Sequence, residues 1–176
     1  DNQGKGGDGM LYLKEANWED REEEFTFLTQ MPQDENGSIN PCFGMTQGEF
    51  FTQGLPQMID NAKGIGLPEG YVPATTYFLW ENNKIVGKFN LRHRLSEALR
   101  NGGGHIGYSI RKDCRGRGLA TEGLRMVLEK ARDIVPEEEI YLHAQLQNLA
   151  SLRVMEKNGA YIHHQDDTGY YTRIKK

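Results

Sequence analysis

A glycine-rich turn with two arginines is the part of this sequence whose residue types best suit chemistry. The segment is Arg-Gly-Arg-Gly-Leu-Ala at residues 115–120, between a strand expected over residues 104–110 and a helix expected from about Gly118. Glycines lack side chains, so consecutive N–H groups at a helix N-terminus can approach phosphate oxygens closely. The helix dipole and the two guanidinium groups add positive charge at the same place. The turn therefore predicts a pyrophosphate site.

Composition places the chain among globular proteins and restricts its partners. The 176 residues include 37% hydrophobic and 26% charged side chains, which suits one domain with a substantial core. A net charge of −4 and the lack of a basic block argue against nucleic acid as the main partner. We also expect no membrane partner and a cytoplasmic location, because no apolar run spans a bilayer and no signal-peptide pattern is present. Two isolated cysteines, Cys42 and Cys114, predict neither a disulfide framework nor a zinc site, and no metal is expected.

The N-terminal region predicts a leader, a strand and a helix. Residues 1–9 are polar and glycine-rich, and we expect them to form a disordered leader before a single domain over residues 10–176. Residues 11–15 predict a short strand, and Asn17 can cap the helix that follows. The acidic run over residues 19–24 is interpreted as a solvated face of that helix.

A long segment rich in glycine, proline and asparagine follows, over residues 31–75. Within it, Thr46 and Glu49 have the spacing of a capping box and predict a second helix, broken near Gly54. Long irregular segments in compact domains are often binding loops. This segment is our candidate for the wall that determines substrate specificity.

The remainder of the chain alternates strands and helices. Glu81-Asn82-Asn83 predicts a tight antiparallel hairpin between the first two of these strands. Asn148 predicts the cap of the last helix, and Gly159 predicts its end. Strands are expected over residues 75–80, 84–92, 104–110, 140–144, 160–164 and 170–174, and helices over residues 118–135 and 148–158.

This order of elements and two motifs resemble the GNAT superfamily of acetyl-CoA-dependent N-acetyltransferases. Residues 115–120 match the superfamily signature Arg/Gln-x-x-Gly-x-Gly/Ala. Residues 148–160 are similar to the Asn-x-x-Ser…Glu-Lys-x-Gly-Phe segment of the ribosomal-protein-alanine branch. The resemblance covers the chain from about Met10 and implies an α/β (mixed α+β) fold. That fold has a mostly antiparallel twisted sheet of about seven strands, with strands 4 and 5 parallel and splayed and with helices on both faces.

The resemblance implies acetyl-CoA as co-substrate and acetyl transfer to a primary amine by direct attack in a ternary complex. The acceptor is a small molecule or a protein N-terminus, and a homodimer is consistent with the superfamily. Backbone groups of Ser109 and Ile110 would pair with the pantetheine arm, and Asn148 and Ser151 would contact the cofactor, although Asn148 is equally well explained as a helix cap. The turn residues expected to hold the pyrophosphate are Arg115, Gly116, Arg117, Gly118, Leu119, Ala120 and Thr121.

The catalytic groups are less well defined by the sequence. His105 begins the cofactor strand and is our first candidate for the base, ahead of His143, because an imidazole titrates near neutral pH. Many relatives place a tyrosine acid on the helix after the fifth strand, where this chain has Met155. Tyr108 is one candidate to replace it.

Two further possibilities concern the acceptor and the class of protein. Arg92 and His93 end a strand beside the expected cleft and could bind a substrate carboxylate or simply face solvent. A dinucleotide-binding fold also has glycines at the start of a helix, in the pattern Gly-x-Gly-x-x-Gly. It is excluded, because the third glycine of this pattern would fall at Thr121. A non-catalytic acetyl-CoA sensor remains the alternative to an enzyme.

Overall fold

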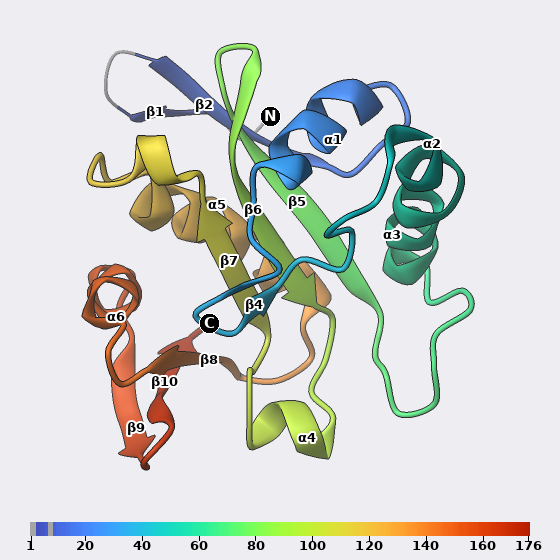
Figure 1. The fold of residues 1–176 in the computed structure, drawn as a ribbon. Helices are drawn as coiled ribbons and strands as arrows, with labels where there is room; N and C mark the ends of the chain where they lie inside the picture. The colour runs from blue at the N-terminus through green and yellow to red at the C-terminus, as the bar shows by residue number, and fades with distance from the viewer. Residues whose placement is uncertain (1–2, 7–8) are drawn as a thin grey trace.

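The computed structural model describes residues 3–6 and 9–176, and its elements run in the order shown in Figure 1. The strands are β1 Gln3–Gly6, β2 Gly9–Glu15, β3 Asp34–Glu35, β4 Ser38–Ile39, β5 Ala74–Glu81, β6 Lys84–Arg92, β7 Ile106–Ile110, β8 Glu139–Gln145, β9 Tyr161–Gln165 and β10 Gly169–Lys175. The helices are α1 Arg21–Thr29, α2 Gln47–Glu49, α3 Leu55–Ala62, α4 Glu97–Arg100, α5 Leu119–Ile134 and α6 Leu149–Lys157. None of the helices in this described part of the chain is long and apolar enough to cross a membrane.

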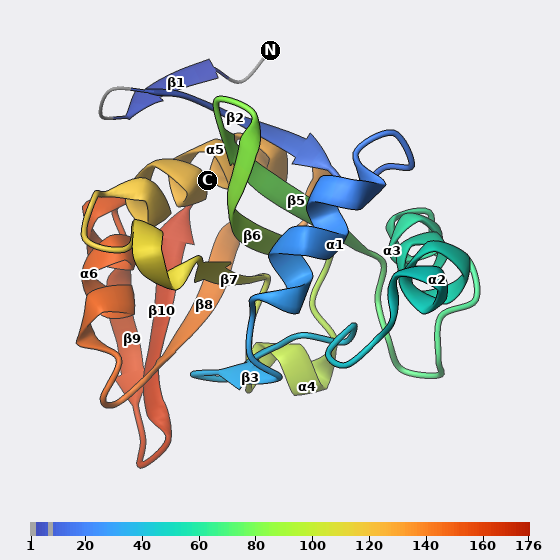
Figure 2. The same ribbon diagram turned by 45° about the horizontal axis from the view of Figure 1, so that its top comes forward.

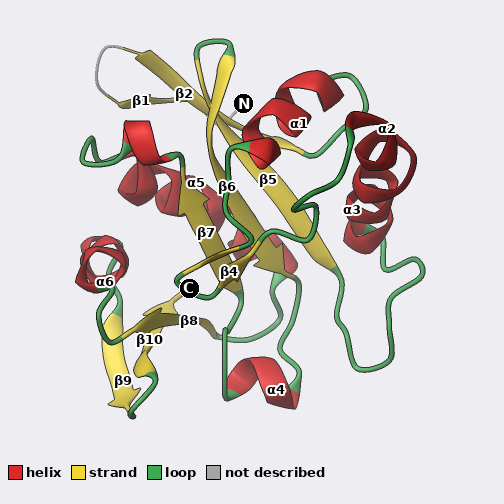
Figure 3. Cartoon of the chain, viewed as in Figure 1, coloured by secondary structure: helices red, strands yellow, loops and turns green. Residues whose placement is uncertain are grey.

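The larger strands form two separate sheets (Figure 3). One has the order β1-β2-β5-β6-β7 and the other the order β8-β10-β9, and every pairing in both is antiparallel. Within residues 3–6 and 9–176 no ladder joins β7 to β8. The mixed α/β fold with a mostly antiparallel sheet is confirmed. The expectation of one sheet of about seven strands is corrected to sheets of five and three strands, because β7 and β8 diverge too far to pair.

The two sheets meet where the chain enters β7. The His105 N–H donates to the carbonyl oxygen of Tyr141 at 2.7 Å. A Cβ on Gly104 would lie only 2.2 Å from the same oxygen, and Gly104 has φ +69°, so this position requires glycine. Beyond this contact the strands separate, which opens a gap between the sheets.

Helices cover both faces of the five-stranded sheet (Figure 2). The amphipathic helix α5 packs one side against β6 and β7, and its buried residues join a core that extends to β8, α6 and β10. On the opposite face α1 and α3 pack over β5 and β6 and enclose a second core that includes Phe50 and Phe78. The chain thus buries two apolar layers with the sheet between them.

Local signals placed most of these elements correctly. The capping box at Thr46 and Glu49 is formed, with both of its hydrogen bonds at 3.1 Å. The helix it begins changes to a π-helical turn over Phe50–Gly54 before α3, which is the expected break. The β5–β6 hairpin turns at Asn82, whose φ is +57°.

The N-terminal segment differs from its prediction. Gln3–Gly6 form strand β1, paired antiparallel with β2, where a disordered leader was expected. Gly9 also belongs to a strand, β2. Residues 1–2 and 7–8 of the expected leader lie outside the described residues.

Glu24 corrects the interpretation of the acidic run as a solvated face. Glu22 and Glu23 are exposed, but the Glu24 side chain is only 1% exposed. One of its carboxyl oxygens accepts a hydrogen bond from the Asn17 N–H at 3.0 Å, and the other has no hydrogen-bond partner. Burial raises the pKa of this carboxyl from its usual 4.5 to about 8. Asn17 also accepts a hydrogen bond from the Asp20 N–H, but the N-cap of α1 is Asp20, so the cap expected at Asn17 lies three residues before the helix cap.

Candidate functional site

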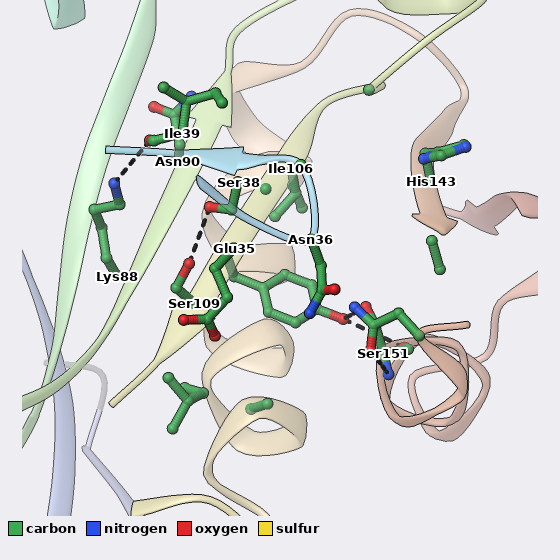
Figure 4. A pocket seen from close by; sticks show the side chains of 18 of the residues that line it. Glu35, Asn36, Ser38, Ile39, Lys88, Asn90, Ile106, Ser109, His143 and Ser151 are labelled. Atoms are coloured by element: carbon green, nitrogen blue, oxygen red, sulfur yellow. Dashed lines mark hydrogen bonds between the residues drawn. The ribbon is translucent and has the colours of Figure 1, made fainter. Parts of the chain in front are cut away.

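A cleft of about 1260 Å³ lies between the two sheets. One side is formed by β7 and part of β6, and the other by β8 and α6. The glycine-rich turn lies at one end of the cleft, and the short β3–β4 hairpin crosses the front (Figure 4). Most of the residues singled out from the sequence line this one cleft.

The glycine-rich turn has the geometry of an anion cradle. Gly116 and Gly118 have φ of +79° and +76°, and no atom lies within 4 Å of where a Cβ would stand on either residue. Gly118 is the N-cap of α5 and supplies no side-chain oxygen to the first amides of that helix. These amides, together with the dipole of a 16-residue helix, provide unsatisfied donors beside open space. The turn therefore fits a pyrophosphate, with Leu119, Ala120 and Thr121 along the same lining.

The two arginines of the turn point to different places. Arg115 lines the cleft, where its guanidinium pairs with Glu35 and donates to the carbonyl oxygen of Ile110. Arg117 pairs instead with Glu81 and lines a smaller pocket behind the turn. The Arg117 side chain is therefore separate from the cleft, although its backbone belongs to the turn.

The free edge of β7 presents to the cleft backbone groups that do not pair with another strand. The Arg111 N–H donates to the Val86 carbonyl oxygen, so Ile110 and Gly87 form a non-hydrogen-bonded pair of the β6–β7 ladder. The backbone N–H and C=O groups of successive residues point to opposite edges of a strand. Those of Ser109 therefore point toward β6, and those of Tyr108 and Ile110 point toward the cleft. The strand-like pairing expected of Ser109 and Ile110 is therefore open to Ile110 but not to the Ser109 backbone.

Tyr108 and Ser151 meet across the cleft. The Tyr108 hydroxyl lies 2.6 Å from Ser151 Oγ, which joins β7 to α6. Burial raises the pKa of Tyr108 to about 12, so the phenol keeps its proton over the physiological range. Asn148 caps α6 by accepting from the Ser151 N–H, and both residues line the cleft.

His105 does not occupy the position expected of a base. Its side chain is 0% exposed and does not line the cleft. One ring nitrogen lies 2.9 Å from a Glu137 carboxylate oxygen, and the other accepts from the Tyr141 N–H at 2.9 Å. Burial lowers its pKa, partly opposed by Glu137. With both nitrogens engaged, His105 joins the two sheets instead of facing a substrate.

His143 is the histidine that lines the cleft. It projects from β8, with its ring 4.7 Å from that of Tyr171 and Nε2 3.5 Å from Thr168 Oγ1. Burial lowers its pKa, partly opposed by Asp166, which favours the neutral imidazole at pH 7. It is our second candidate for the base from the sequence, after His105. The alternation of side chains along a strand does not show which of two strand histidines faces a cleft.

The remaining predicted residues divide between the cleft and the core. Met155 is 1% exposed and accepts a hydrogen bond from Thr172, so the usual acid position faces the core. Arg92 lines the cleft but donates to the Gly104 carbonyl oxygen at 3.0 Å. His93 bonds Thr75 at 2.7 Å and is not part of the lining.

The sequence alone did not indicate two groups of cleft residues. The first is the β3–β4 hairpin, which places Glu35 against Arg115 and Ser38 against Ser109, the latter at 3.0 Å. Its Asn36-Gly37 turn is a strong hairpin signal within the segment read only as a binding wall. The second comprises Lys88 and Asn90, which form a polar row on β6 with the predicted Arg92; the alternation of these residues with apolar ones marks a polar strand face.

Comparison with known families identifies the fold and its chemistry. A family model described as the acetyltransferase (GNAT) domain matches residues 57–161, more than half of the chain and including β7, the turn and α6. The chain belongs to the GNAT acetyltransferase family. It is an acetyl-CoA-dependent N-acetyltransferase, and within residues 10–176 no cluster of three or more His, Cys, Asp or Glu side chains could hold a metal ion.

Solved structures of low sequence identity share the fold of this GNAT acetyltransferase. A GNAT-family acetyltransferase from Streptococcus pneumoniae is 20% identical, with 94% of this chain and 99% of that chain covered and a TM-score of 0.62. Mycobacterium smegmatis RimJ, in complex with CoA-disulfide, is 16% identical with coverages of 99% and 87% and a TM-score of 0.65. The ribosomal-protein-S5-alanine acetyltransferase of Vibrio fischeri is 15% identical with coverages of 99% and 97% and a TM-score of 0.61. A search of curated proteins found no match.

Proposed function

We propose that this GNAT acetyltransferase transfers the acetyl group of acetyl-CoA directly to a primary amine while both substrates occupy the cleft. One observation carries the proposal: a single cleft contains both the open glycine turn and a polar region beneath the β3–β4 hairpin. The turn and the free edge of β7 suit the pyrophosphate and the amide-bearing arm of coenzyme A. The region beneath the hairpin, lined by Thr76, Lys88, Asn90 and Ser109, leaves room for the amine, and we call it the acceptor chamber.

Tyr108 is our proposed proton donor. When the acceptor nitrogen attacks the thioester carbonyl, the C–S bond breaks and the departing thiolate needs a proton or an equivalent stabilising charge. The Tyr108 phenol is protonated, lines the cleft and is oriented by Ser151. It comes from β7 and so takes the role that Met155 on α6 cannot fill.

His143 is our proposed base. The attacking amine must be neutral and must lose one proton when the amide forms. A neutral imidazole accepts this proton, and the lowered pKa of His143 keeps it neutral at pH 7 and above. Thr168 and Tyr171 restrict the orientation of the ring.

Two measurements test the function. Calorimetry should detect coenzyme A binding, and a free-thiol assay should detect coenzyme A release from acetyl-CoA when amino acids, peptides and polyamines are offered. Lack of binding would reject the assignment of the cleft. Binding without thiol release from any acceptor would instead support a sensor.

Matched variants test the two residue roles. Tyr108→Phe should lower kcat by about 10- to 1000-fold with little change in coenzyme A affinity, because it removes only the proton donor. Tyr141→Phe is the control, because its hydroxyl lies outside the cleft beside Arg100. His143→Gln should abolish the acidic limb of the pH–rate profile, whereas His163→Gln, on an exposed strand, should leave it in place. Equal effects of either variant and its control would reject that role.

A further inference from the structure

A buried lysine faces the acceptor chamber without a carboxylate partner. Lys88 is on β6, is only 7% exposed and lines the cleft. Its one hydrogen bond runs to the carbonyl oxygen of Ile39 on the hairpin, at 3.3 Å (Figure 4). The ion pairs within residues 10–176 do not include Lys88. A buried ammonium with one neutral acceptor is an unfavourable arrangement unless a ligand completes it.

Other polar groups surround Lys88 on the same face of the sheet. Ser109 is its register partner on β7, and Asn90 follows two residues along β6. Thr76 is the register partner of Asn90 on β5, and directly opposed residues share a face. We call Thr76, Lys88, Asn90 and Ser109 the polar floor, and all four line the cleft. Ammonium, amide and hydroxyl groups together can donate several hydrogen bonds to one anion.

The charge of the cleft also favours an anionic acceptor. The described residues that line it include five cationic side chains, Lys88, Arg92, Arg115, Arg153 and Lys157. Glu35 is the one acidic side chain among them, and it is paired with Arg115. This excess of positive charge occurs in a chain whose net charge is −4. Arg115 lies at the glycine turn, whereas Lys88 lies on the acceptor side of β7.

The position of the polar floor limits how far the anion can be from the amine. Lys88 is one strand away from β7, whose far edge faces the cofactor. Neighbouring strands are about 4.8 Å apart, so the anion and the reacting nitrogen are separated by roughly 5–10 Å. A residue spans about 3.5 Å, so this distance exceeds the separation of amine and carboxylate in a free α-amino acid. Nothing lies within 4 Å of a Cβ on Gly107, so there is space between the bound anion and the reacting nitrogen.

We propose that Lys88, together with Asn90 and Thr76, binds a carboxylate of the acceptor, so that the substrate is an amine with an acidic group roughly 5–10 Å away. This inference rests on the proposed function. The carboxylate belongs either to an acidic side chain near a peptide N-terminus or to the distal group of a dicarboxylic amino acid. Both present the same chemistry to the polar floor.

Paired acceptors test the proposal and distinguish these sources. Glutamate is compared with glutamine, and a peptide beginning Ser-Glu with one beginning Ser-Gln, by the thiol-release kcat/KM. We expect about a 10- to 100-fold preference for the acidic member of at least one pair, which is the range for hydrogen bonds to a charged group. The pair that shows the preference identifies the source.

Substitutions on β6 show whether Lys88 causes the preference. Lys88→Met should remove it, whereas Lys88→Arg should retain it. The control is Lys84→Met, on the same strand but exposed and outside the cleft, which should also retain it. Coenzyme A affinity, measured in parallel, shows whether Lys88→Met is folded, and replacing a buried ion by an apolar chain is usually tolerated.

The outcomes separate this inference from the proposed function. Thiol release without preference in either pair would overturn the carboxylate site and leave the acetyltransfer intact. An equal loss for both members of a pair in Lys88→Met would also overturn it. No release from any acceptor would overturn both.

Discussion

Replacing Glu24 by glutamine should stabilise the protein in a pH-dependent way. Glu24 is buried in the native state, with one carboxyl oxygen unpaired. Its carboxyl therefore stays protonated up to about pH 8 in the folded chain, but it ionises near pH 4.5 once unfolded. Glutamine resembles the protonated acid in size and can still accept the Asn17 hydrogen bond through its carbonyl oxygen.

The size of the effect follows from the pKa difference. A raised carboxyl pKa means that the folded state binds the proton more tightly, so wild-type stability falls as pH rises from about 4.5 to about 8 and is level above that. At about 1.4 kcal/mol per unit, the shift from 4.5 to about 8 corresponds to an upper bound of about 5 kcal/mol. Local relaxation and water entry reduce this figure, and we expect Glu24→Gln to gain at least about 2 kcal/mol at pH 8.5.

Urea unfolding of the wild type and Glu24→Gln at half-unit steps from pH 5 to 8.5 measures the difference directly. The two free energies of unfolding should be similar at pH 5 and should diverge as pH rises. Other ionisable groups contribute to both proteins and cancel in the comparison. Glu23→Gln, the exposed neighbour, should give a small difference that is constant with pH. A constant difference for Glu24→Gln as well would refute the assignment of a protonated buried carboxyl.

Three further predictions concern the join between the sheets and the glycine turn. Gly104→Ala should lower the free energy of unfolding by about 2 kcal/mol or more, because its Cβ would meet the Tyr141 carbonyl oxygen. Gly66→Ala is the control, because Gly66 has φ +68° and open space, so this variant measures the cost of backbone strain alone. Gly118→Ala should weaken coenzyme A binding about tenfold in calorimetry, since φ +76° strains alanine and its Cβ enters the cradle; undiminished affinity would place the pyrophosphate elsewhere. His105→Gln should destabilise the fold by about 1–3 kcal/mol through lost buried hydrogen bonds but leave the pH–rate profile in place; a displaced acidic limb would restore His105 as the base.

Local signals in the sequence were sufficient for most of the fold. The capping box at Thr46, the helix cap at Asn148 and the hairpin at Asn82 each depend on a few adjacent residues, and all three are found in the structure. The glycine turn is local in the same sense, because two glycines before a helix create the open amides themselves.

The features that the sequence did not predict depend on distant contacts. The family resemblance leads us to expect that β7 and β8 splay apart, but no short segment encodes how far they diverge, and this divergence divides the strands into two sheets. His105 and His143 are both strand histidines, and only the packing of Glu137 and Tyr171 against them distinguishes a buried join from a cleft residue. Glu24 has the same residue type as its exposed neighbours, and the sequence does not distinguish them because burial depends on what packs over α1.

The contact between His105 and Tyr141 joins the two sheets at one end of the cleft, so a rotation of one sheet relative to the other pivots about this contact. The strand β7 runs five residues from this contact toward the glycine turn, a length of about 16 Å. A rotation of about 5° between the two sheets at the closed end would move the open end by about 1.5 Å, comparable to a covalent bond length. Small changes in packing near Gly104 are therefore magnified at the mouth of the cleft, far from the residues that cause them.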